Sequence, residues 1–126
     1  YAPLGVGRHV DHQHAFLAAM LLHERGEEVW FYEDLPYAIN DGVLDARLAA
    51  LAATHPVETA AVVDVRAVWP TKLAAIAAYP SQLPTVFGYV GSGSGPAEID
   101  ATMRRYAERT GDGTPAERFW RPVGPA

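Results

Sequence analysis

The stretch PLGVGRHVDHQHAFLAAMLLHERG, residues 3–26, sets the first repeat of the fold. Residues 3–6 form a short apolar stretch that is predicted to be the end of a strand, and Gly7-Arg8 then turns the chain. Asp11 is placed to cap a following helix at its N-terminus, and Gly26 is placed just beyond its C-terminus. Residues 11–25 are predicted to be that helix, because apolar side chains recur there every three or four positions: Phe16, Leu17, Met20 and Leu21.

The same alternation of strand and helix continues along the chain. Two apolar segments are predicted to be strands buried on both faces, and Phe119-Trp120 is predicted to be a short closing strand. This order predicts an α/β fold, Rossmann-like, with a largely parallel sheet flanked by helices. Residues 1–126 are expected to form a single domain or the C-terminal portion of one. The predicted buried strands are 29–32 and 59–65, and the later helices are 41–53, 71–79 and 99–109.

Composition removes several classes of function. The chain has 10 basic and 15 acidic side chains and a net charge of −5, which gives no basic surface for nucleic acid. It contains no cysteine, so any metal must be bound by histidine or carboxylate, and a cytoplasmic location is expected. No apolar run approaches the roughly 20 residues of a membrane span.

The segment GRHVDHQH, residues 7–14, holds three of the five histidines. It follows a predicted strand and opens a helix, where open parallel sheets bind their ligands. His9 and His12 are three positions apart and can converge on one helix face. One imidazole can then coordinate Zn²⁺ while the other donates to an oxyanion, with Asp11 as its carboxylate partner. The alternative is a polar capping turn whose side chains are exposed.

A complete zinc site needs more than this segment. Zinc enzymes generally use three protein ligands and leave one position open for water. No second cluster of histidine or aspartate follows in the sequence. We therefore expect an N-terminal part of the same protein to supply the remaining ligands.

Four segments together resemble one known family. They are PLGVGRHVDHQHAF, VWFYEDLPYA, VDVRAVWPTKLAAIAAYPSQL and ERFW, which begin at residues 3, 29, 63 and 117. In this order they resemble the C-terminal half of the PIG-L/LmbE-like deacetylases. The resemblance implies a zinc-dependent enzyme that hydrolyses a linear amide, removing an N-acetyl group from an N-acetylglucosamine-type sugar or glycoside. It implies one Zn²⁺ per active site, which other divalent metals can replace.

The resemblance also implies roles for individual residues. In the family, a His-Pro-Asp-Asp-Glu motif supplies two zinc ligands and the general base, and a later H-x-D-H motif supplies the third ligand. Carried over, His12 is the zinc ligand and His9 stabilises the oxyanion or acts as acid. Asp11 orients the His9 ring. Separately from the resemblance, Arg8 flanks the motif and is expected to contact a polar sugar or phosphate group of the substrate, the alternative being a solvated side chain.

The His-Pro-Asp-Asp-Glu motif is absent from these 126 residues. The fragment alone is therefore expected to be inactive, and its expected partners are a small glycan or glycoside, the N-terminal half and, in a homo-oligomer, further copies of itself. Two alternatives stay open. One is another metal-dependent hydrolase, such as a phosphoesterase, and the other is a non-catalytic sugar-binding or structural module that lacks a complete metal site.

Overall fold

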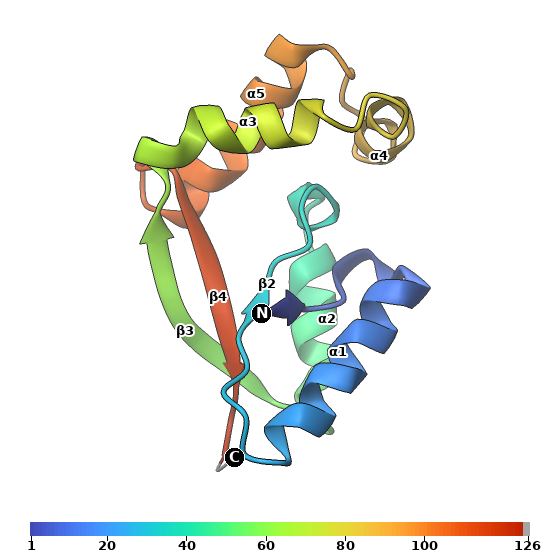
Figure 1. Cartoon of the computed structure of the whole chain (residues 1–126), viewed down its shortest axis with the longest axis vertical. Coiled ribbons are helices and arrows are strands. Elements are labelled where there is room, and N and C mark those ends of the chain that lie inside the picture. The colour runs from blue at the N-terminus through green and yellow to red at the C-terminus, as the bar shows by residue number, and fades with distance from the viewer. Residues whose placement is uncertain (125–126) are drawn as a thin grey trace. The chain divides into compact units, whose positions relative to one another are not determined.

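The computed structural model describes residues 1–124 (Figure 1). The chain divides into two compact units, residues 1–62 with 118–124, and residues 63–117. No helix in the described part is both long and apolar enough to cross a bilayer. The elements in chain order are β1 (Ala2–Pro3), η1 (Val6–Arg8), α1 (Val10–His23), β2 (Phe31–Tyr32), η2 (Tyr37–Ile39), α2 (Val43–Leu51), β3 (Val57–Asp64), η3 (Arg66–Val68), α3 (Trp69–Ala77), α4 (Leu83–Tyr89), α5 (Pro96–Thr110) and β4 (Ala116–Pro122).

The four strands form one sheet in the order β1-β2-β4-β3. β1 and β2 are parallel, with Ala2 opposite Phe31, whereas β2 and β4 are antiparallel, with Phe31 opposite Trp120. The α/β class is confirmed, but the sheet is mixed, and the prediction of a largely parallel sheet is wrong. The reason is β4, which is a seven-residue strand lying between β2 and β3. Local sequence patterns do not show that a closing segment will pair inside a sheet.

Helix α1 forms where its periodicity predicts, but its N-terminus differs from the prediction. The N-cap is His9, whose backbone is extended, and Asp11 lies inside the first turn. Asp11 therefore does not cap the helix, although its charge faces the positive end of the helix dipole. Phe16, Ala19 and Met20 form the buried face of α1.

The predicted buried strands are less buried than expected. None of the eight residues of β3 is buried, and Val62 and Val63 are 49% and 44% exposed. In the first strand segment Phe31 is fully buried, but Tyr32 is exposed. β3 is an edge strand of the sheet, and its apolar side chains stay partly exposed in the part of the chain that the structure describes.

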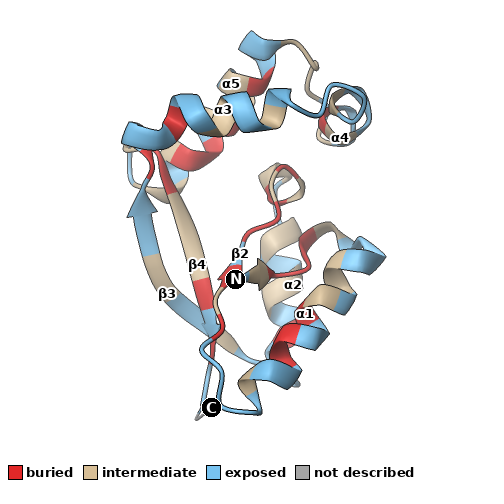
Figure 2. Ribbon diagram, viewed as in Figure 1, coloured by how far each residue is buried: buried red, intermediate tan, exposed pale blue. Residues whose placement is uncertain are grey.

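The core of the first unit lies between α1 and the start of the sheet, and part of α1 is buried (Figure 2). The largest fully buried side chains of this core include Leu4, Phe16 and Phe31. The Phe16 and Phe31 rings are 4.6 Å apart, centre to centre. Arg47 from α2 lies over the Phe16 ring at 4.8 Å, and its Nε donates to the Leu4 carbonyl at 2.9 Å. These contacts hold α1 and α2 against the strand that leads into the histidine segment.

The second unit is built from three helices. Helix α4 was not expected from the sequence, whereas α3 and α5 match predicted helices. Trp69 Nε1 donates to Asp100 Oδ1 at 2.8 Å, and the Arg104 guanidinium lies 4.9 Å from the Trp69 ring. The side chains of α5 that face this core recur at helical spacing: Ile99, Met103, Tyr106 and Ala107.

Candidate functional site

The histidine segment begins in a tight loop between β1 and α1. Three of its residues have left-handed backbone, with φ of 81° at Gly5, 83° at Gly7 and 61° at Arg8. Glycine adopts this region freely, but a residue with a Cβ pays roughly 1–2 kcal/mol. Backbone strain of the kind seen at Arg8 is often found at functional sites.

The loop also has no room for added side chains. A Cβ on Gly7 would lie 2.7 Å from Cβ of Tyr37, whereas a Cβ on Gly26 would meet nothing within 4 Å. We expect Gly7→Ala to lower the free energy of unfolding by more than the roughly 1–2 kcal/mol that left-handed backbone costs. Gly26→Ala, whose φ is 92°, pays only the backbone cost. Urea unfolding of both variants measures the difference, and equal losses would contradict the close packing of Gly7 on Tyr37.

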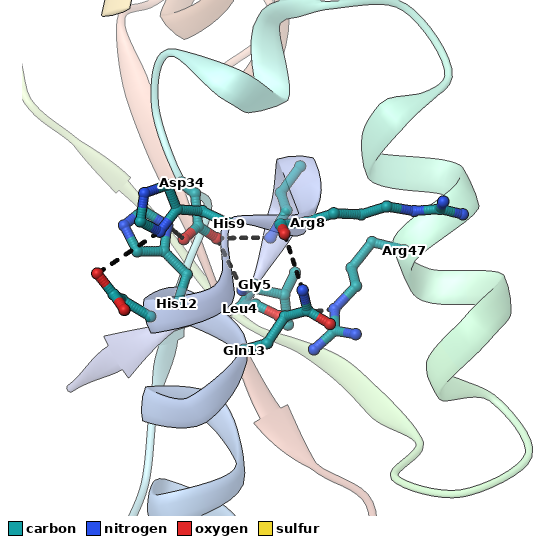
Figure 3. Close-up of polar contacts among 10 residues, drawn as sticks. Leu4, Gly5, Arg8, His9, His12, Gln13, Asp34 and Arg47 are labelled. Carbon is teal, nitrogen blue, oxygen red and sulfur yellow. Dashed lines mark hydrogen bonds and ion pairs between the residues drawn. The ribbon is translucent and has the colours of Figure 1, made fainter.

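Asp34 anchors this loop from the end of β2. The backbone N–H groups of Gly5 and Val6 each donate to Asp34 Oδ2 at 2.9 Å. The carboxylate is buried, with 2% of the residue exposed. Its other oxygen, Oδ1, lies 2.6 Å from Nδ1 of His12 (Figure 3). One buried carboxylate therefore fixes both the loop and the first turn of α1.

Burial dominates the electrostatics of this pair. It raises the pKa of the Asp34 carboxyl, and the amides of Val6 and Gly5 and the His12 ring offset that effect only in part. Burial likewise lowers the pKa of Arg47, which the charge on Asp34 opposes. The same two influences, burial and the Asp34 charge, raise the pKa of Tyr32. A carboxylate is thus held at a position where its charge is costly.

The two ring nitrogens of His12 have different surroundings. Nδ1 and Asp34 Oδ1 are both buried, and their close contact lacks the alignment of a hydrogen bond. It is therefore described as a close polar contact between the ring and the carboxylate. The side chain is 33% exposed, and no described residue hydrogen-bonds Nε2. Nε2 is available to a ligand.

The structure brings His9 and His12 together, as their spacing predicts. Their ring centres are 4.9 Å apart, and the Tyr37 ring lies 5.8 Å from His12 and 6.5 Å from His9. Asp11 is less well placed as a partner for His9. Its Oδ2 is 3.9 Å from His9 Nδ1, too far for a hydrogen bond, and the two side chains are 80% and 45% exposed.

Arg8 contributes its backbone to the local structure. Its carbonyl accepts from Gln13 Nε2 at 2.8 Å, which ties the loop to α1. Its side chain is exposed, and Figure 3 shows it extending away from the imidazole rings of His9 and His12. Contact between Arg8 and a substrate stays a prediction.

Glu33 and Asp34 are not among the site residues that the sequence analysis singles out. Both are buried. Glu33 accepts from Trp120 Nε1 at 3.0 Å and lies 3.8 Å from Nε of Arg118, whereas Asp34 faces His12. The signal that was available is a pair of carboxylates directly after an apolar strand, at the edge of the sheet that carries the histidine loop.

The metal site is incomplete in the part of the chain that the structure describes. Residues 1–124 contain no group of three or more histidine, aspartate or glutamate side chains that could hold a metal ion. His12 by itself fits a metal ligand, because its Nδ1 faces a carboxylate and its Nε2 is unbonded, the usual arrangement around metal-bound histidine.

Comparison with known proteins identifies two solved structures of similar fold. No family model and no curated protein matches the sequence. The structure is similar to the zinc-inhibited form of teicoplanin deacetylase Orf2, with a TM-score of 0.68 and 21% identity over 96% of this chain. It is also similar to the A40926 pseudoaglycone deacetylase Dbv21, with a TM-score of 0.66 and 23% identity over 99% of this chain. The chain spans 43% and 49% of the lengths of these two proteins and has the fold of that part of each.

Proposed function

We propose that this chain is the part of a metal-dependent N-deacetylase that carries one metal ligand and the histidine that stabilises the transition state. The observation that carries the proposal is the environment of His12. A buried carboxylate faces its Nδ1, and its Nε2 is free beside a second imidazole, that of His9. The likeness in fold to two deacetylases and the resemblance to the PIG-L/LmbE-like family support the same reading.

His12 would hold the metal through Nε2, and the other ligands would come from an N-terminal segment, as the resemblance implies. When bound, a divalent cation acidifies a water molecule and polarises the acyl carbonyl. Zn²⁺ is the metal that the resemblance implies. Because one structural neighbour is a zinc-inhibited form, the active metal is to be tested among Zn²⁺, Co²⁺ and Mn²⁺.

His9 carries the remaining chemistry of this chain. Hydrolysis adds the hydroxyl of water to the acyl carbon and breaks the C–N bond, and the leaving nitrogen takes up a proton. His9 is exposed next to His12, where it can donate a hydrogen bond to the oxyanion and then deliver that proton. Asp11 orients the His9 ring once the 3.9 Å separation closes to a hydrogen bond.

The proposed substrate is an N-acetylated sugar or glycoside. The neighbours are deacetylases of teicoplanin and of the A40926 pseudoaglycone, which favours an acylamino sugar carried on a larger molecule. The site lies at an exposed loop and helix start, so such a molecule can reach it. Arg8, exposed on the same loop, is proposed to contact a polar group of the substrate.

The proposed partner within the protein is an N-terminal half that covers α1. Four large apolar side chains on this helix are exposed. Three of them recur at helical spacing along one face, Val10, Leu17 and Leu21, at 58%, 47% and 56%, and the fourth is Leu22. Exposed apolar surface of this kind commonly marks an interface. Val10 directly follows His9, so a segment docked on this face would lie next to the two histidines and could bring the missing ligands.

The alternative of a non-catalytic module is favoured by one observation, the absence of a three-ligand group in residues 1–124. An assay separates the two readings. The complete polypeptide that contains this chain is stripped of metal, reloaded with each cation, and incubated with an N-acetylglucosaminide and with a phosphate ester. We expect acetate release that depends on metal. Phosphate release instead, or no acetate with any metal, would contradict a deacetylase.

A further inference from the structure

We infer that Asp34 is a positioning residue that fixes the tautomer of His12, keeping the proton on Nδ1 and leaving Nε2 as the bare nitrogen. The tautomer of His12 is inferred from contacts within the described residues alone. Only the effect of Asp34 on metal binding rests on the proposed function.

The geometry leaves Asp34 little freedom. Two backbone N–H groups, those of Gly5 and Val6, hold Oδ2 at 2.9 Å each, and burial excludes water from the carboxylate. The carboxylate therefore cannot rotate away, and Oδ1 is left facing Nδ1 of His12 at 2.6 Å. An ionised carboxylate can only accept, so the favourable state of this contact has the proton on Nδ1.

A purely structural role for Asp34 would need only the oxygen that holds the loop. Asparagine has such an oxygen and carries no charge, so it would anchor Gly5 and Val6 without the cost of burying a carboxylate. The second oxygen, Oδ1, lies against Nδ1 of His12. The structure thus separates the two roles of Asp34, one on each oxygen.

Asp34→Asn exploits this separation. Its carbonyl oxygen can keep both loop amides, which places its NH₂ group against Nδ1 of His12. An NH₂ group donates, so it favours the tautomer with a bare Nδ1 and the proton on Nε2. The variant is expected to keep the loop and invert the ring, whereas a residue that served only the loop would leave the ring unchanged.

The experiment is ¹⁵N NMR of the histidine rings of the metal-free complete polypeptide at about pH 8, where an ordinary imidazole is neutral. The signals of His12 are assigned by their loss in His12→Gln. We expect the parent chain to show a protonated Nδ1 and a bare Nε2, and Asp34→Asn to show the reverse. A parent chain with the proton on Nε2 overturns the inference by itself, even if the variant does not fold.

Metal binding supplies a second readout, with Zn²⁺ alone as the probe. Titration of the complete polypeptide is expected to show affinity about 10–100-fold weaker in Asp34→Asn, the usual effect of losing a carboxylate behind a histidine ligand. Glu33→Gln is the matched control, because it neutralises the adjacent buried carboxylate, which bonds Trp120. It is expected to leave the His12 tautomer and the zinc affinity unchanged.

The outcomes separate the two proposals. Equal loss of zinc affinity in Glu33→Gln and Asp34→Asn would overturn the inference, since the effect would then come from general disturbance of this segment. If Asp34→Asn inverts the tautomer but the parent protein releases no acetate, the role of Asp34 is supported and the deacetylase proposal is contradicted. If the parent protein releases acetate but has the same tautomer as Asp34→Asn, the deacetylase proposal is supported and the role of Asp34 is contradicted.

Discussion

His12→Ala is expected to release the metal from the complete polypeptide and to reduce acetate formation to background. The variant removes one of the ligands of the proposed site, and a zinc centre with a protein ligand missing is held far more weakly. Elemental analysis of the dialysed protein gives the metal content, and an acetate assay gives the rate.

His14→Ala is the matched control for this variant. His14 is exposed on the same helix but lies two positions further, about 200° around the axis from His12. It is expected to retain metal and rate. Equal metal content in His12→Ala and the parent protein would contradict the assignment of His12 as a ligand.

His9→Ala is expected to keep the metal and lose turnover, with kcat lower by about 10²–10³, the usual cost of removing one oxyanion donor. The His9 side chain makes no capping hydrogen bond to α1, so alanine leaves the start of the helix intact. Steady-state kinetics with metal content measured on the same sample separates chemistry from binding. A parent-like kcat, or a loss of metal equal to that of His12→Ala, would remove His9 from its proposed role.

Several elements of this fold are predicted by local sequence patterns. Helix α1 follows from apolar side chains at helical spacing, and Pro70 marks the first turn of α3. The mixed sheet does not follow from such patterns, because β4 is placed by pairing with Phe31 and Tyr32, far away in the chain. The exposure of Val62 and Val63 also lies outside local reasoning, since burial depends on what covers an edge strand.

The candidate site, too, is only partly predictable from local sequence. The convergence of His9 and His12 follows from a spacing of three residues, and the structure places their ring centres 4.9 Å apart. The contact of Asp34 with His12 joins two elements that only the sheet brings together, so no local pattern contains it. The sequence signal for such a contact is a carboxylate that comes shortly after a predicted buried strand.

The central claim is that Nε2 of His12 binds a metal whose other ligands come from outside residues 1–124. The most direct test is a crystal structure of the complete polypeptide loaded with Zn²⁺. We predict a distance of about 2.0–2.1 Å from Nε2 to the metal, with Nδ1 still against Asp34. A metal bound without His12, or through Nδ1 with Asp34 displaced, would contradict the account.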